Sequence, residues 1–118
     1  MERAARRTLD LDPNRYEAQE LLVQSLFARG AWPEGESICR QLLERDSGKA
    51  MYHAMLADSL FRQKCIEEGI AAAEKSLTCD PTQLGVRHRL VEAYNQLGKP
   101  ELSAKHQTIL DRLPRRRP

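Results

Sequence analysis

The stretch from Ala50 to Pro81 reads AMYHAMLADSLFRQKCIEEGIAAAEKSLTCDP and decides the fold of this 118-residue chain. It contains two amphipathic helical patterns separated by a short polar break, and the same frame recurs on both sides at a spacing of 34 residues. A fixed period of this length indicates stacked helix–turn–helix units, so the sequence predicts an all-α chain. The positions that keep the period are Asp12, Asp46 and Asp80; Leu22, Leu56 and Leu90; Leu9, Leu43 and Leu77; and the small residues Gly35, Gly69 and Ser103.

Apolar spacing of three and four residues, together with proline and glycine breaks, gives the expected helices. We expect them over residues 1–11, 15–28, 32–45, 49–63, 66–78, 83–97 and 100–112. Asn14, with Glu17 three residues later, is expected to cap the second helix. Gly35 and Gly69 occupy the same place within helices, where glycine is costly, so we expect two helix backbones to approach closely there. In the final helix we expect one apolar stripe of Leu102, Ile109, Leu110 and Leu113.

The period divides the chain into a leading half repeat over 1–15 and full repeats over 16–49, 50–83 and 84–114. Residues 1–114 thus form one repeat domain, and 115–118 are expected to be a basic, flexible tail. A lone second helix at the start would leave one apolar side uncovered, whereas terminal repeats usually present polar surface. We therefore expect the chain to be a fragment of a longer repeat array.

These phased residues resemble the tetratricopeptide repeat (TPR) family, over residues 1 to about 114. The central unit carries the resemblance through Leu56, Ala57, Leu60, Gly69, Ile70, Leu77, Asp80 and Pro81. The sequence departs from the family pattern at several positions. Val23 and Val91 replace the usual small residue beside the leucine, Lys64 replaces a turn glycine, and Ser47 replaces a proline. Cys39 and Gln107 stand where an aromatic residue or alanine is common. The resemblance implies a right-handed α-solenoid of antiparallel helix pairs, with about seven helices, whose first helices line a concave groove.

The groove-facing positions of the first helices are the candidate partner-binding residues. They are Leu21, Gln24 and Phe27 in the first unit; Met51, Met55, Asp58, Phe61 and Arg62 in the second; and His88, Arg89 and Glu92 in the third, with Ala54 and Gly85 beside them. Exposed methionines and other apolar side chains suit recognition of apolar or helical segments. The sequence therefore predicts a protein-interaction module that binds a protein or peptide partner, without a cofactor.

Two other functions remain open at this point. The chain could be a self-association module that forms a homo-oligomer through exposed helix faces, since the same apolar set could be an oligomer contact. It could also be a non-catalytic repeat fragment of a larger enzyme or regulatory protein. One TPR subclass clamps the acidic tail of heat-shock chaperones with basic and amide side chains. Of the matching positions here only Arg89 fits, and Glu20 would repel a carboxylate, so we reject that binding mode.

Composition argues against several other classes. The net charge of +2 does not indicate nucleic-acid binding, although Arg87, Arg89, Arg112 and the arginines of the tail could form a basic end. Hydrophobic residues make up 41% of the chain, but no apolar run is long enough to span a membrane. Three cysteines without a C-x-x-C spacing indicate free thiols and hence favour the cytoplasm.

No catalytic or metal-binding motif is present in the sequence. His53, His88 and His106 fall one in each repeat, and no pair of them has the spacing of a metal-binding helix. Cys79 and His88 could approach each other, yet core or surface roles suit them better than a nucleophile pair. We therefore predict that the chain is not an enzyme and holds no metal.

Overall fold

The computed structural model describes residues 1–112, so Leu113 of the expected stripe and the expected tail over 115–118 lie outside the described residues. Every regular element in the described part is an α-helix. The helices are α1 (Glu2–Leu11), α2 (Tyr16–Ala28), α3 (Trp32–Arg45), α4 (Ala50–Arg62), α5 (Ile66–Cys79), α6 (Leu84–Gln96) and α7 (Pro100–Asp111).

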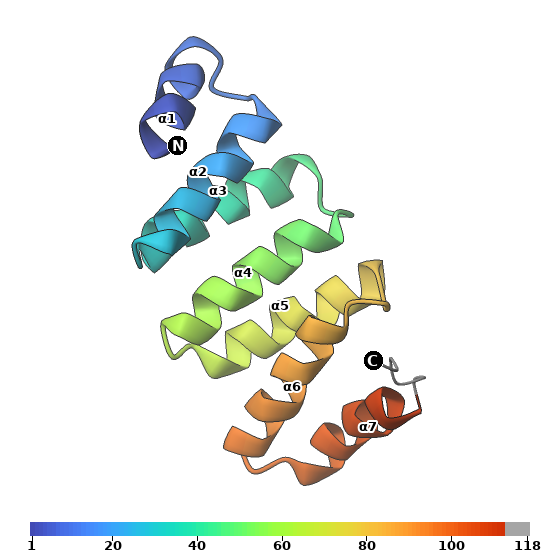
Figure 1. Ribbon diagram of the computed structural model, residues 1–118. Helices are drawn as coiled ribbons and strands as arrows, with labels where there is room; N and C mark the ends of the chain where they lie inside the picture. Colours follow the sequence, from blue (N-terminus) through green and yellow to red (C-terminus); the bar gives the residue numbers. More distant parts are fainter. Residues whose placement is uncertain (113–118) are drawn as a thin grey trace, which may run out of the picture.

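The helices are stacked in chain order from α1 at one end to α7 at the other (Figure 1). All the extensive helix–helix contacts join helices that are consecutive in sequence. The radius of gyration is 15.7 Å and the extents are 48 × 32 × 27 Å. A compact domain of this length would have a radius of gyration of about 13.5 Å. The molecule is therefore elongated, and the predicted all-α solenoid of antiparallel helix pairs is confirmed.

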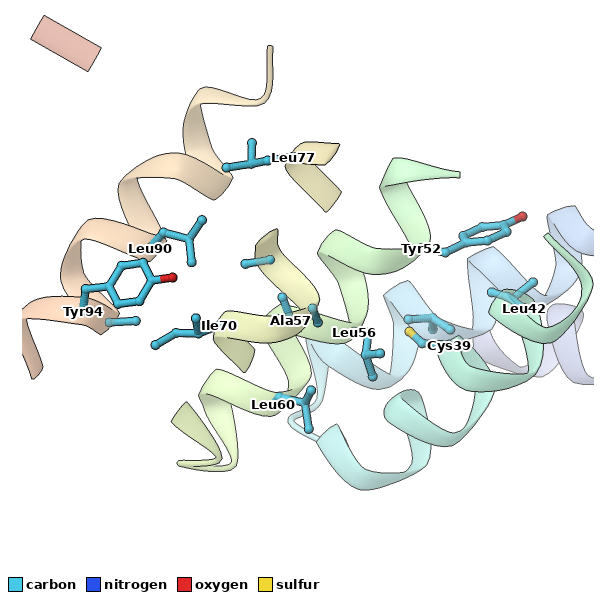
Figure 2. Packing of buried hydrophobic residues seen from close by; sticks show 14 residues of the cluster. Cys39, Leu42, Tyr52, Leu56, Ala57, Leu60, Ile70, Leu77, Leu90 and Tyr94 are labelled. Carbon is cyan, nitrogen blue, oxygen red and sulfur yellow. The ribbon is translucent and has the colours of Figure 1, made fainter. Parts of the chain in front are cut away.

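The periodic leucines of the first helices are all buried. Leu22, Leu56 and Leu90 are 4%, 7% and 0% exposed, one in the first helix of each pair. Most of the buried residues of α2 to α6 form one continuous cluster, so each pair packs on the next through a shared core. Figure 2 shows this cluster extending from Leu42 to Tyr94. Such a core is typical of solenoids, in which each unit is stabilised by its neighbours.

The periodic aspartates fix the turns between repeats. Oδ1 of Asp12, Asp46 and Asp80 accepts a hydrogen bond from the backbone N–H two residues later, at 3.3, 3.3 and 3.0 Å. This is an Asx turn, in which the side chain substitutes for a backbone acceptor. The expected cap by Asn14 is wrong, because α2 starts after Arg15 and has no side-chain cap, while the N–H of Asn14 bonds to Asp12.

Two buried polar side chains stabilise these turns at equivalent positions. His53 Nε2 lies 2.7 Å from the carbonyl oxygen of Ser47, and the Arg87 guanidinium donates to the carbonyl oxygen of Pro81 at 3.0 Å. Each partner lies six residues earlier, and the two pairs are one period apart. His53 is therefore a structural residue that stabilises the turn before α4.

The turns within helix pairs also share one backbone conformation. Gly30, Lys64 and Gly98 have φ of 77°, 67° and 69°, which is the left-handed region. Glycine adopts this region without a steric penalty, whereas a residue with a Cβ does not. Lys64 therefore carries conformational strain that its two equivalents do not have.

We expect Lys64→Gly to raise the free energy of unfolding by about 0.5–1 kcal/mol, because relief of the strain exceeds the added chain entropy of the unfolded state. Urea denaturation followed by far-UV circular dichroism measures this change. Gly98→Ala is the matched control, since its Cβ would meet nothing within 4 Å and only φ opposes it. It should destabilise the protein by about 1 kcal/mol. A stabilising Gly98→Ala would show that this turn does not demand glycine.

Glycine is required at positions 35 and 69 because an aromatic ring packs against the backbone there. A Cβ added to Gly35 would lie 2.4 Å from the Phe27 ring, and one added to Gly69 would lie 2.6 Å from the Phe61 ring. The space that a Cβ would need is occupied by the ring of the first helix, and not by its backbone as expected from the sequence. Both phenylalanines are consequently half-buried, and only part of each ring remains available to a partner.

The expected apolar stripe of α7 is wrong. Leu102 and Ile109 are 41% and 39% exposed, while Leu110 is half-buried. The face that packs on α6 carries Ser103 and His106, which are 5% and 7% exposed. The register of the repeat, and not the hydrophobicity of the side chains, sets which face is buried. Ser103 takes the place of Gly35 and Gly69.

A polar network anchors α7 to the preceding pair. Arg87 donates from Nη1 to Nδ1 of His106 at 3.0 Å, and Nε2 of His106 lies 3.2 Å from a Glu74 carboxylate oxygen. Arginine has no acceptor, so Nδ1 accepts and Nε2 carries the proton. The Tyr94 hydroxyl donates to Glu74 at 2.7 Å. Burial, followed by this bond, raises the pKa of Tyr94 to about 12, so its hydroxyl stays a donor.

Ion pairs anchor α1 at the other end. Arg6 and Arg29 each bind both Glu2 and Glu34, with N–O distances of 2.8 to 3.4 Å. The hydrogen bonds from Arg29 and then Arg6 lower the pKa of Glu2. The side of α1 away from α2 is mostly charged, in contrast to the uncovered apolar side expected from sequence.

Candidate partner-binding groove

The first helices of the three pairs line a groove with two lobes. The first lobe has a volume of about 380 Å³ and is lined by Phe27, Ala50, Met51, Ala54, Met55, Asp58, Asp80 and Gln83. The second has a volume of about 270 Å³ and is lined by Ala54, Ala57, Asp58, Phe61, Ala73, Gly85, Val86 and Arg89. Both lobes include Ala54 and Asp58, so they are continuous across α4. We call the two lobes together the groove.

Small residues hollow out the second lobe. Ala54 and Ala57 lie on α4, and Gly85 lies in the first turn of α6. A Cβ built on Gly85 meets no atom within 4 Å, so the space above it is open. The φ of Gly85 is not positive, so no backbone strain requires glycine there. This position therefore forms a notch between α4 and α6 that a partner side chain could fill.

One carboxylate in the groove is neutralised by arginines. Asp58 Oδ1 lies 3.2 Å from Arg89 Nη2 and 3.7 Å from Arg62 Nε. The Arg89 guanidinium also lies over the Phe61 ring, with 5.3 Å to its centroid. This bridge connects α4 with α6 at the second lobe. Arg89 is consequently committed to contacts within the chain.

The other carboxylate has no basic partner. Asp80 accepts hydrogen bonds from the Thr82 hydroxyl at 2.6 Å and from the Thr82 N–H at 3.0 Å, which lower its pKa. None of the described lysines and arginines forms an ion pair with it. Asp80 is also the residue that follows the last turn of α5, where the helix dipole adds negative potential. The first lobe thus carries an ionised, uncompensated carboxylate.

A smaller hollow extends the groove along α6. It has a volume of about 150 Å³, and it includes Phe61 and Arg89 of the second lobe. Lys64, Glu92 and Gln96 give it a polar lining. The line of hollows therefore changes from apolar and acidic at the first lobe to mixed charge at this end.

The predicted site residues divide into two groups. Those that line one of these three hollows are Phe27, Met51, Met55, Asp58, Phe61, Arg89 and Glu92. Those that line none of them are Leu21, Gln24, Arg62 and His88. Leu21 is 39% exposed, and Arg62 lies over the Trp32 ring with 5.2 Å to its centroid. The structure therefore brings together the second-unit residues and only part of the other two sets.

Six residues that line the two lobes were not predicted to lie in the groove: Ala50, Ala57, Ala73, Asp80, Gln83 and Val86. Asp80 and Gln83 belong to the turn before α6, and Val86 was expected in the core. The period gave Asp80 a turn role only, because no pattern in the sequence shows that this turn borders the second-unit methionines. Val86 is half-buried, so it contributes to both the core and the groove.

A larger furrow lies on the other side of α4, between α3 and α5. Its volume is about 570 Å³, with Leu56 and Leu60 among its lining residues. The small side chains Ala71 and Ala72 leave this space between consecutive second helices. Its rim carries Arg40, which binds Glu36 at 2.9 Å and lies 3.8 Å from Glu68. The furrow is therefore the main alternative to the groove as a binding surface.

Several residues considered from sequence have other roles in the structure. Burial raises the pKa of the Cys39 thiol to about 12, so it stays protonated. Cys79 and His88 are both exposed, and no hydrogen bond joins them in the described part of the chain. Arg87 is buried and Arg89 is paired, so neither adds to an exposed basic end.

Two features are absent from the described residues. Residues 1–112 contain no group of three or more histidine, cysteine, aspartate or glutamate side chains placed to hold a metal ion. None of the helices described here has the length and hydrophobicity required to cross a membrane.

The fold resembles solved structures of MamA. One MamA crystal structure has a TM-score of 0.83 and 17% sequence identity over 89% of this chain. MamA residues 41 to the end from Desulfovibrio magneticus RS-1 have a TM-score of 0.86 and 18% identity over 92% of this chain. MamA AMB-1 has a TM-score of 0.84 and 16% identity over 95% of this chain. No model of a protein family matches the chain, and no curated protein matches it.

Identities this low show the fold alone. The chain spans 61% of the length of each of these three MamA chains. The class defined by the helix order and the matches is a TPR-like helical-repeat fold.

Proposed function

We propose that the chain is a TPR protein-interaction module, and that it binds a segment of a partner protein in the groove. The proposal is supported above all by the second lobe, which is open and mostly apolar, and whose notch at Gly85 is filled by no side chain of the described chain. Gly85 and Ala54 form its walls, and Met51 and Met55 extend apolar surface into the first lobe. Such clefts, with few charged groups at the rim, are typical of peptide-binding sites. The free thiols favour a reducing compartment, so we place the module in the cytoplasm.

The size of the groove suits one or two apolar anchors. Full burial of one leucine or phenylalanine side chain is worth about 1.5–3 kcal/mol. Half-buried Phe27 and Phe61 add ring edges to the two lobes but are held by Gly35 and Gly69. They are therefore rigid walls, whereas the unbranched methionines can adapt to the partner.

A substitution that fills the notch tests this function without damage to the fold. Peptides selected from a random displayed library on the wild-type protein are measured by calorimetry on Gly85→Leu. We expect the peptide affinity to fall at least about tenfold, a loss of about 1.4 kcal/mol of binding free energy. Stability should stay the same or rise by up to about 1 kcal/mol, because leucine is the better helix former.

Asn95→Leu is the matched control, because Asn95 is an exposed residue of the same helix and lines none of the three hollows. It should leave the affinity unchanged within about twofold. Peptides that bind Gly85→Leu as well as they bind wild type would refute the groove as the binding surface.

Self-association is the second candidate, and one observation favours it. Leu102 and Ile109 lie on the same face of α7, and they remain 41% and 39% exposed among the described residues. An exposed pair of this kind can pack on a second copy. Sedimentation equilibrium at several concentrations tests this function: a monomer at the highest concentration excludes it, whereas a dimer lost in Ile109→Glu supports it.

A further inference from the structure

The first lobe has an acidic character that its surroundings do not neutralise. Its lining includes two carboxylates, Asp58 and Asp80, and no basic side chain. Asp58 is neutralised by Arg89 and Arg62, so the unbalanced charge belongs to Asp80. Lys49, next to the lining residue Ala50, is bound to Glu20 at 3.2 Å and does not compensate Asp80.

We propose that the partner segment of the groove is a cationic amphipathic peptide. Its apolar side chain fills the notch above Gly85, and its lysine or arginine pairs with Asp80. This inference rests on the proposed function, which it deepens by naming the chemistry of the partner.

Three features of Asp80 recognise a cation. Its carboxylate is held in place by two hydrogen bonds from Thr82, which leave it ionised. It stands at the C-terminal end of α5, where the helix dipole favours positive charge. It also lines the same lobe as Met51 and Met55, so an apolar side chain and a cation of one segment can be bound together.

An acidic partner is disfavoured by the same groups. A carboxylate in the first lobe would face Asp80 with no unpaired basic residue among the lining side chains. Arg89 is at the second lobe, but it is already shared between Asp58 and the Phe61 ring. The groove therefore discriminates by charge at one end and by shape at the other.

The chain offers a matched pair of variants. Asp80→Asn removes the charge, and its amide oxygen keeps the acceptor of the Asx turn. Asp46→Asn makes the same change in the equivalent turn one period earlier, where Asp46 lines none of the hollows. Both variants have the same net charge and keep the Asx turn; apart from the site, they differ in the Thr82 hydroxyl bond that only Asp80 accepts.

The probes are three synthetic peptides of about four helical turns. They share one leucine stripe and differ at two polar positions, which are both lysine, both glutamine or both glutamate. In wild type we expect the order of affinity to be lysine, then glutamine, then glutamate. Asp80→Asn should weaken the lysine peptide by about threefold to fivefold, the range of a partly exposed ion pair, and leave the glutamine peptide unchanged. Asp46→Asn should change neither, and high salt should reduce the lysine preference.

The outcomes separate this inference from the proposed function. Equal affinity for all three peptides, each weakened by Gly85→Leu, would overturn the cationic partner while the groove stands. An equal loss in Asp46→Asn would also overturn it, because the effect would then be one of net charge. No binding of the lysine peptide at about 1 mM would overturn it outright, and binding that Gly85→Leu leaves intact would overturn the groove itself.

Discussion

Leu90→Ala should lower the free energy of unfolding by about 2–5 kcal/mol, the range for a buried leucine in a close-packed core. Leu90 is 0% exposed in α6, between α5 and α7, and belongs to the continuous core cluster. In a solenoid each unit depends on its neighbours, so loss of this contact weakens the attachment of the last pair to α5. Urea denaturation followed by circular dichroism measures the loss.

Leu84→Ala is the control for Leu90→Ala. Leu84 lies in the same helix and is 46% exposed, so we expect a change within about 0.5 kcal/mol. A similar loss in both variants would mean that burial in the repeat frame does not govern stability, and the repeat account of the core would fail.

Gly69→Ala should lower the free energy of unfolding by about 1–3 kcal/mol, the cost of overpacking a filled site. The added methyl group would lie 2.6 Å from the ring of Phe61, well inside van der Waals contact. The ring must therefore move toward the groove, with loss of its contact on the helix. The same methyl group at Gly85 would meet nothing, so Gly85→Ala should stabilise α6 by up to about 1 kcal/mol.

A double-mutant cycle with Phe61→Ala isolates this contact. In the Phe61→Ala background, Gly69→Ala should be neutral or stabilising, since alanine is the better helix former. If Gly69→Ala costs the same with and without the ring, the ring is not the reason for this glycine.

The 34-residue period predicted much of the architecture because residues one period apart adopt the same backbone conformation. The aspartates at 12, 46 and 80 form the same turn, and Lys64 adopts the left-handed conformation of the glycines one period away. These features depend on a few local atoms, so sequence position is sufficient to predict them. The expected cap by Asn14 failed because α2 begins only after Arg15, and Asp12 already binds the Asn14 N–H that Glu17 would accept in a capping box.

The apolar stripe predicted for α7 from hydrophobicity was wrong. Leu102 and Ile109 were predicted to lie on the buried face because their side chains are apolar. The 34-residue period, however, already aligned Ser103 with Gly35 and Gly69, which lie on the buried face of their helices. His106 is buried because Arg87 and Glu74 satisfy its ring nitrogens, which no local pattern in the sequence reveals. Terminal helices are thus predicted better by register than by composition.

Only some of the residues that line the groove could be predicted from the sequence. Helical spacing correctly placed Met51, Met55 and Asp58 on one face of α4. It could not show that a turn residue, Asp80, lies beside them, because that proximity depends on how consecutive pairs stack. Leu21 and His88, one period removed from Met55 and Ala54, line none of the three hollows.

We expect the face of α4 and α6 that bears the notch to bind the partner. The most direct test is a titration of the isotope-labelled protein with the lysine peptide, followed by backbone amide NMR signals. We expect the signals of Ala54, Gly85 and Val86 to shift, while those of Leu43 and Ala71 in the opposite furrow stay in place. Shifts centred on Leu43 and Ala71, with Ala54 and Gly85 unchanged, would contradict it.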